Sequence, residues 1–167
     1  ANTTGTQNIA LGAFALDASS TASFCTAVGY NSLGANTTGT QNTAIGRQAL
    51  GANTSGGYNN ALGSSALASN TTGNQNIGIG YHALILNTTG NSNVAVGHGA
   101  LDANTTADNN TAMGNGALSE NTTGTNNVAV GSGALDANTT ANYNTAVGDS
   151  SLTSNTTGTR NTAVGAN

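Results

Sequence analysis

Apolar and polar residues recur in this chain at a fixed interval of seventeen positions. Leucine recurs at that interval from Leu16 to Leu152, and glycine recurs from Gly12 to Gly165 without an insertion or deletion. A fixed period below about 50 residues is typical of solenoids and other repeat arrays. The sequence therefore predicts ten copies of one structural unit. We number the positions of each copy from the Asn of its N-T-T segment, so that the first copy begins at Asn2.

Alternation within each copy predicts a short β-strand over positions 7 to 10, as in N-T-A-I. Positions 8 and 10 of such a strand lie on one face, and position 9 lies on the other. The glycine at position 11 favours a bend, and the N-T-T-G segment favours a corner. We expect a second short strand through the Ala-Leu pair at positions 14 and 15. Each copy is thus predicted to be one coil of an all-β, parallel β-solenoid, with like residues stacked about 4.8 Å apart.

Two apolar ladders are expected to fill the coils, one from the larger apolar residue at position 10 and one from the leucine at position 15. The leucine ladder consists of Leu16, Leu33, Leu50, Leu67, Leu84, Leu101, Leu118, Leu135 and Leu152. Burial of each such side chain contributes roughly 1.5–3 kcal/mol, whereas each ordered residue costs about 1–2 kcal/mol of backbone entropy. Two large apolar groups do not offset seventeen ordered residues, so we expect several chains to associate.

The row of small residues at position 9 is the expected contact between chains. With position 10 pointing inward, position 9 faces outward, and small side chains permit close approach of another sheet. The proposed interchain face consists of Ala10, Ala27, Ala44, Ala61, Ala95, Ala112, Ala129, Ala146 and Ala163.

Composition and charge exclude several classes of function. Only 5 % of the 167 residues are charged, and the net charge is -4. Two basic residues, Arg47 and Arg160, are too few to neutralise a nucleic-acid backbone. No apolar run approaches the roughly 20 residues that span a bilayer, so no membrane insertion is expected. Residues 1–167 are predicted to form a single repeat array, and because both ends fall within a repeat we expect a segment of a longer fibre.

Segments such as N-T-A-I-G-R-Q-A-L (42–50) and N-V-A-V-G-H-G-A-L (93–101) resemble the repeat of the YadA-type head of trimeric autotransporter adhesins. That unit reads roughly S-V-A-I-G-x-x-A-x-A-x-G, and similar repeats occur in fibre proteins of bacteria, phages and large viruses. The resemblance implies a left-handed β-roll, three chains side by side, an extracellular, cell-surface or virion location, and no enzymatic activity. The period here is longer than the family's usual unit, and the extra residues fall in the N-T-T-G corner.

The function expected from these features is a structural or adhesive fibre segment. Its partners would be copies of itself, as a homotrimer or an end-to-end filament, and a host surface or glycan. Ice binding is the alternative, because threonine ladders at positions 2 and 3 run along the corner, for example through Thr37, Thr38, Thr71 and Thr72. An ice-binding plane requires Thr-x-Thr on one strand face, however, and adjacent threonines of a strand point to opposite faces.

Reaction chemistry is not evident in the sequence. His82 and His98 occupy neighbouring positions of adjacent coils, but no third metal ligand is evident. No catalytic triad or recurring carboxylate pair is present, so neither an enzyme nor a cofactor or metal site is expected. Cys25 stands alone where nine of the ten repeats carry Asn, which excludes an intrachain disulfide.

Ten asparagines begin an N-x-S/T sequence, which is the acceptor for N-linked glycans. A repeated acceptor at a corner would carry a column of sugars along the fibre, whereas the structural alternative makes these residues corner and ladder groups. The ten are Asn2, Asn36, Asn53, Asn70, Asn87, Asn104, Asn109, Asn121, Asn138 and Asn155.

Overall fold

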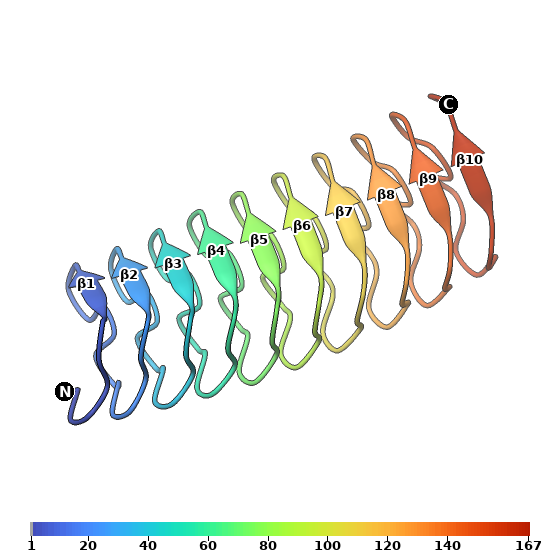
Figure 1. Cartoon of the computed structure of the whole chain (residues 1–167). Helices are drawn as coiled ribbons and strands as arrows, with labels where there is room; N and C mark the ends of the chain where they lie inside the picture. The colour runs from blue at the N-terminus through green and yellow to red at the C-terminus, as the bar shows by residue number, and fades with distance from the viewer. Residues whose placement is uncertain (1) are drawn as a thin grey trace.

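The computed structural model describes residues 2–167, which form ten three-residue strands and no helix (Figure 1). The all-β, parallel β-solenoid expected from the sequence is confirmed. The strands are β1 (Ile9–Leu11), β2 (Thr26–Val28), β3 (Thr43–Ile45), β4 (Asn60–Leu62), β5 (Ile77–Ile79), β6 (Val94–Val96), β7 (Thr111–Met113), β8 (Val128–Val130), β9 (Thr145–Val147) and β10 (Thr162–Val164).

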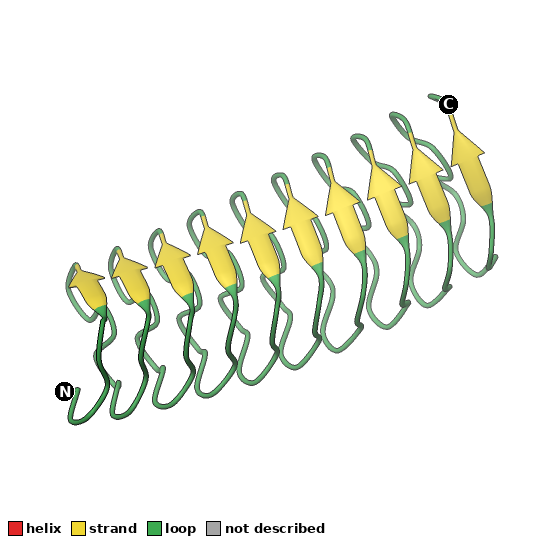
Figure 2. Ribbon diagram, in the orientation of Figure 1, coloured by secondary structure: helices red, strands yellow, loops and turns green. Residues whose placement is uncertain are grey.

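All ten strands lie in one parallel sheet, in the order of the sequence from β1 to β10. Each residue pairs with the residue seventeen positions later, as Ala27 pairs with Ala44. Like residues are therefore stacked along the axis. The strands occupy one side of an elongated coil stack, and the rest of each coil consists of turns and loops (Figure 2).

The Ala-Leu pair at positions 14 and 15 forms a turn, so the prediction of a second strand there is wrong. The leucines at position 15 have φ between 49° and 54°, the left-handed conformation, which costs a residue with a side chain roughly 1–2 kcal/mol. Hydrogen bonds hold this geometry. Leu50 N donates to Ala66 O of the next coil at 3.0 Å, and Asn53 N donates to Leu50 O at 3.1 Å.

Leucine at position 15 fills the interior of the coil together with alanines at positions 9 and 14. From Leu33 to Leu135 the leucines are fully buried. Each leucine reaches across to the opposite strand. A Cβ atom added to Gly78 at position 9 would lie 3.3 Å from Leu67 Cδ1, so only a small side chain fits there. The coil is too thin to hold a second large apolar ladder.

Position 9 therefore faces the core and position 10 faces outward, the reverse of the prediction. The proposed interchain face was wrong, because a row of buried side chains cannot contact another chain. In the interior coils these residues are buried, with 0–1 % of each exposed: Ala27, Ala44, Ala61, Ala95, Ala112, Ala129 and Ala146. The end members Ala10 and Ala163 belong to the same inward row.

Two ladders of buried asparagines accompany the apolar core, at positions 1 and 7. In the position-1 ladder each carboxamide donates to the one before it, as Asn70 Nδ2 donates to Asn53 Oδ1 at 2.9 Å. In the position-7 ladder each side-chain oxygen accepts from the next backbone, as Asn59 Oδ1 accepts from Asn76 N at 2.9 Å. Buried polar groups are costly unless they are hydrogen-bonded, and these ladders satisfy them coil by coil.

The two ladders meet at the carbonyl of position 4. Gly73 O accepts from Asn70 Nδ2 of its own coil at 3.0 Å and from Asn59 Nδ2 of the preceding coil at 2.8 Å. One carbonyl thus accepts from both ladders and links two successive coils. This arrangement ties the corner to the strand and explains why Asn recurs at both positions.

Coil 2 interrupts both ladders, because Ser19 and Cys25 replace the two asparagines. Among residues 2–167, Ser19 Oγ is the buried side-chain polar atom that lacks a hydrogen-bond partner. The thiol of Cys25 donates to Gly39 O at 3.4 Å. Burial raises the pKa of this thiol above its ordinary value, although the backbone N–H of Asn42 opposes the shift, so the thiol remains protonated near neutral pH.

Restoring the ladder in coil 2 is expected to stabilise the array. In Cys25→Asn the new carboxamide oxygen is a strong acceptor for the backbone N–H of Asn42. This hydrogen bond should raise the free energy of unfolding by about 0.5–1.5 kcal/mol. The converse change, Asn59→Cys, breaks an intact ladder and should lower that free energy by about 1–3 kcal/mol. Urea denaturation followed by circular dichroism measures both. Equal effects of the two variants would contradict a role for the ladder.

Glycine at position 11 is required by close approach of the next coil. Its φ lies between 129° and 143° in every coil, a conformation open essentially to glycine alone. A Cβ atom on Gly97 would also collide with the carbonyl oxygen of Gly114. By contrast, Gly116 at position 13 has φ 63°, and a Cβ atom added to it would have no other atom within 4 Å.

The two kinds of glycine should therefore respond differently to substitution. Gly97→Ala should lower the free energy of unfolding by roughly 3 kcal/mol or more, because strain and a backbone collision add. Gly116→Asn should change it by less than about 1 kcal/mol, since Asn tolerates the left-handed region. Thermal melts of the two variants beside the parent chain provide the comparison. A similar loss of stability in both variants would show that the close approach of the next coil at position 11 does not limit which residue can stand there.

Candidate functional site

The outer face of the ten-stranded sheet is the candidate functional site. We call this face the strand strip and define it by the outward-facing residues at positions 8 and 10 of β1 to β10. Ile79 is 38 % exposed, Met113 43 % and Leu62 48 %. The strip contains Thr, Ile, Val, Leu, Met and one Asn, and no charged residue. An exposed apolar surface that runs along the whole array typically marks an interaction site.

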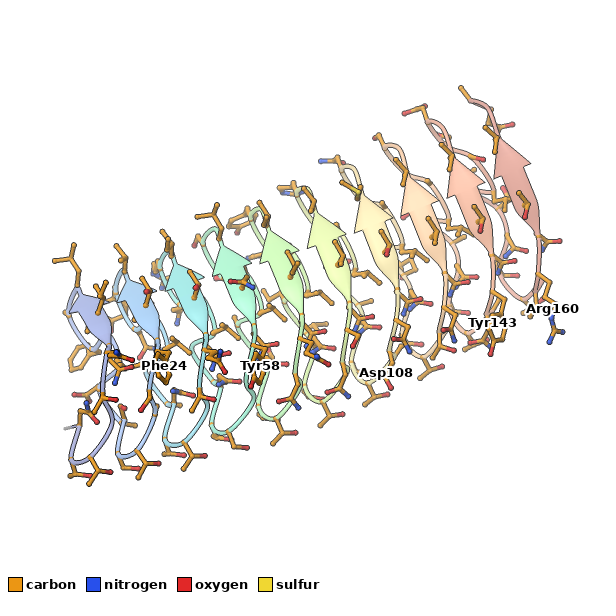
Figure 3. The ribbon with its side chains drawn as sticks, viewed as in Figure 1. Phe24, Tyr58, Asp108, Tyr143 and Arg160 are labelled. Carbon is orange, nitrogen blue, oxygen red and sulfur yellow. The ribbon has the colours of Figure 1, made fainter. Side chains whose placement is uncertain are left out.

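Aromatic residues flank the strand strip. Phe24, Tyr58 and Tyr143 at position 6 are exposed and lie, with Arg160, along one line beside the strands (Figure 3). The Arg160 guanidinium lies 5.5 Å from the centre of the Tyr143 ring. On the other side of the strip, position 12 carries exposed Tyr30 and Tyr81. Aromatic side chains and Arg are enriched at protein interfaces.

The corner asparagines at position 1 are core residues. Their carboxamides are hydrogen-bonded within the ladder, so in the folded interior coils these residues are the corner and ladder groups of the structural alternative and not open acceptors for a column of sugars. The fully buried members are Asn36, Asn53, Asn70, Asn87, Asn104, Asn121 and Asn138. At the two ends of the array, Asn155 is half-buried and Asn2 is exposed. Asn109, at position 6, is exposed.

The two threonine rows of the corner differ in accessibility. At position 2 the hydroxyls are bonded within the array, as Thr71 Oγ1 donates to Thr88 O at 3.0 Å. At position 3 the threonines, such as Thr72 and Thr89, are exposed. The corner therefore presents one exposed row rather than the two-row plane that ice binding requires. Threonines also face outward at position 8, but in only five strands: Thr26, Thr43, Thr111, Thr145 and Thr162.

The two histidines both lie against Tyr81. The ring centroids of Tyr81 and His82 are 3.7 Å apart, and those of Tyr81 and His98 are 5.4 Å apart, in stacked arrangements. Across residues 2–167 there is no group of three or more His, Cys, Asp or Glu side chains placed to hold a metal ion. A shallow groove beside the turns, between Asn31, Gln48 and Leu86, is lined by no titratable residue.

Acidic residues gather near position 16 of coils 6 to 8. Asp102 and Glu120 lie in adjacent coils, and Asp136 in the next coil accepts a hydrogen bond from Ser119 Oγ. Partial burial raises the pKa of Asp102 above its ordinary value, and the negative charge of Glu120 adds to the shift. Hydrogen bonding to the Ala103 backbone and the nearby His82 oppose it.

Comparison with models of protein families, with curated proteins and with solved structures found no similar family, protein or structure. Within residues 2–167 there is also no helix of the length and apolarity needed to cross a bilayer.

Asp102 should make the stability of the array depend on pH. The folded chain binds this proton more tightly than the unfolded chain, so stability falls as pH rises from the ordinary pKa of Asp to the raised one. Asp102→Asn should flatten this part of the profile and increase stability near neutral pH. Thermal melts from acid to neutral pH test this. Asp149→Asn, which removes a charge at an exposed position, is the control, and identical profiles for both variants would contradict the prediction.

Proposed function

We propose that this chain is a structural segment of an extracellular fibre, located on a cell surface or a virion and assembled by lateral association of identical chains. The strand strip is the surface that associates, in a homotrimer of the kind that the adhesin resemblance implies. The observation that carries the proposal is the strip itself, which is uncharged and has an apolar residue at position 10 in all ten coils, beside a position 8 that is either apolar or Thr or Asn.

The dimensions of the strip support lateral association. Ten strands about 4.8 Å apart give a length of about 48 Å, and three residues at about 3.3 Å give a width of about 10 Å. Two copies in contact would bury roughly 1,000 Å² in total, near the lower end for a specific interface. The flanking aromatic rows add to this area. Charge repulsion is weak, because charged residues are absent from the strip.

The regular coil also supports a structural role. Backbone hydrogen bonds join successive coils along the strand, at the turn that contains the Ala-Leu pair, and at the N-T-T-G corner. At the corner, for example, Thr88 N donates to Thr105 O at 2.8 Å. The coil at each end of the array presents the same backbone donors and acceptors that join the interior coils. This favours end-to-end stacking of chains in the same fibre. A host surface or glycan remains the proposed ligand of the exposed aromatic rows.

Lysine substitutions on the strip test the proposal. The parent chain should sediment at three times its 16.1 kDa chain mass. The double variant Ile79→Lys/Met113→Lys should fold but dissociate, because lateral packing would bury unpaired charges. The control Thr89→Lys/Thr123→Lys places the same charges on the exposed corner and should still associate.

Analytical ultracentrifugation with circular dichroism distinguishes the outcomes. A folded parent chain that sediments as a monomer at all concentrations overturns the proposal, and so does an unchanged mass for the strip variant. Thermal hysteresis measured on the same samples tests ice binding, the alternative function.

A further inference from the structure

The ten N-x-S/T sequences of this chain fall into two structural classes. Nine begin at position 1, on the corner, and the tenth begins at Asn109, at position 6. The shared motif does not distinguish them, but their surroundings in the array do.

At the corner the amide nitrogen has no hydrogen left for a sugar. Asn87 Nδ2 donates to Asn70 Oδ1 at 2.8 Å and to Gly90 O at 3.1 Å, so both of its hydrogens are bonded. The side chain is fully buried. A sugar on this nitrogen would replace one of these hydrogens and would need to leave through the packed corner. Attachment at an interior corner therefore requires the coil to open.

Asn109 has none of these restraints. Its backbone N–H donates to Asn91 O at 3.1 Å, while its side chain is exposed and makes no hydrogen bond. Its φ of 60° belongs to the turn that precedes β7. The residues stacked on either side of it at position 6 are Ser92 and Asn126, which are small and polar. The large aromatic residues of position 6 lie in other coils.

The hydroxyl of the motif lies on the same side of the chain as the carboxamide at Asn109, but not at the interior corners. Thr111, two residues later, is the first residue of β7 and faces outward, while Asn110 between them is buried. The carboxamide and the hydroxyl thus share the outer surface. At an interior corner such as Asn87 the carboxamide points inward and the hydroxyl-bearing Thr89 is exposed, so the two groups lie on opposite sides of the chain.

We propose that Asn109 is an acceptor site for N-linked glycosylation of the folded array and that the interior corner motifs are closed to it. The co-substrate is a nucleoside-diphosphate sugar. A bond forms between the sugar C1 and Asn109 Nδ2, the bond from C1 to the phosphate oxygen breaks, and the nucleoside diphosphate leaves with the electron pair. The amide loses one proton to solvent. Thr111 belongs to the strand strip and Asn109 to the row beside it, so the acceptor would be modified on the folded single chain before lateral association, and the proposal rests on the folded coil and not on the fibre function.

A soluble N-glycosyltransferase that recognises N-x-S/T, with UDP-glucose as the sugar donor, provides the test. The chain would carry Asn2→Gln and Asn155→Gln, because Asn2 is exposed at the first coil and Asn155 is only half-buried at the last. Intact mass and peptide mapping should find one hexose on the folded chain, at Asn109. Asn109→Gln and Thr111→Val should each abolish it, whereas Asn126→Gln, an adjacent change outside any acceptor motif, should not.

The heat-unfolded chain is the positive control, since its corners are open and should gain several hexoses. Circular dichroism confirms that each variant is folded before the reaction. A folded chain that gains no hexose at Asn109, while the unfolded chain is modified, overturns the proposal. A hexose mapped to any of the seven buried corner asparagines in the folded chain also overturns it.

Discussion

The carbonyl at position 4 is the point on which the rest of the coil depends. It accepts a carboxamide from the corner of its own coil and another from the strand end of the coil before, and both donors are fully buried. A one-residue change in the length of a coil would leave these groups unpaired in the core, at a cost of about 1–3 kcal/mol each. The strict period of seventeen follows from this geometric requirement.

Thin coils explain how the remaining positions are used. Leucine at position 15 spans the interior and meets a small residue on the opposite strand, as Leu67 meets Gly78. The larger residues of the strand must then face outward, where they form an apolar surface instead of a core. The coil thus encloses only one large apolar side chain and relies on hydrogen-bonded asparagines for much of its interior.

Much of the fold could be predicted from the sequence, because the period, the alternation at positions 7 to 10 and the glycine at position 11 each have a direct structural cause. The inward ladder of Leu50 and its equivalents could also be predicted. The orientation of the strand could not be predicted, since alternation shows only that Ala44 and Ile45 face opposite sides. Hydrophobicity alone favoured placing the larger residue, Ile45, inside. The burial of Asn53 could not be predicted either, because a polar residue in a Thr-rich segment is typical of an exposed corner. The regular spacing of Asn at two positions was the available signal, since a ladder of stacked amides requires it.

The direction of the hydrogen bonds between coils determines how the array would respond to force. These bonds run along the long axis, and no intrachain disulfide joins one coil to another, because Cys25 is the single cysteine of the chain. Tension applied to the two ends of the chain would therefore load the bonds of the outermost coil first and peel it away before its neighbours. Each coil that opens would release seventeen residues, roughly 55 Å of extended chain in place of about 4.8 Å of stacked height. Such a rod would yield in equal steps and dissipate mechanical energy at each step.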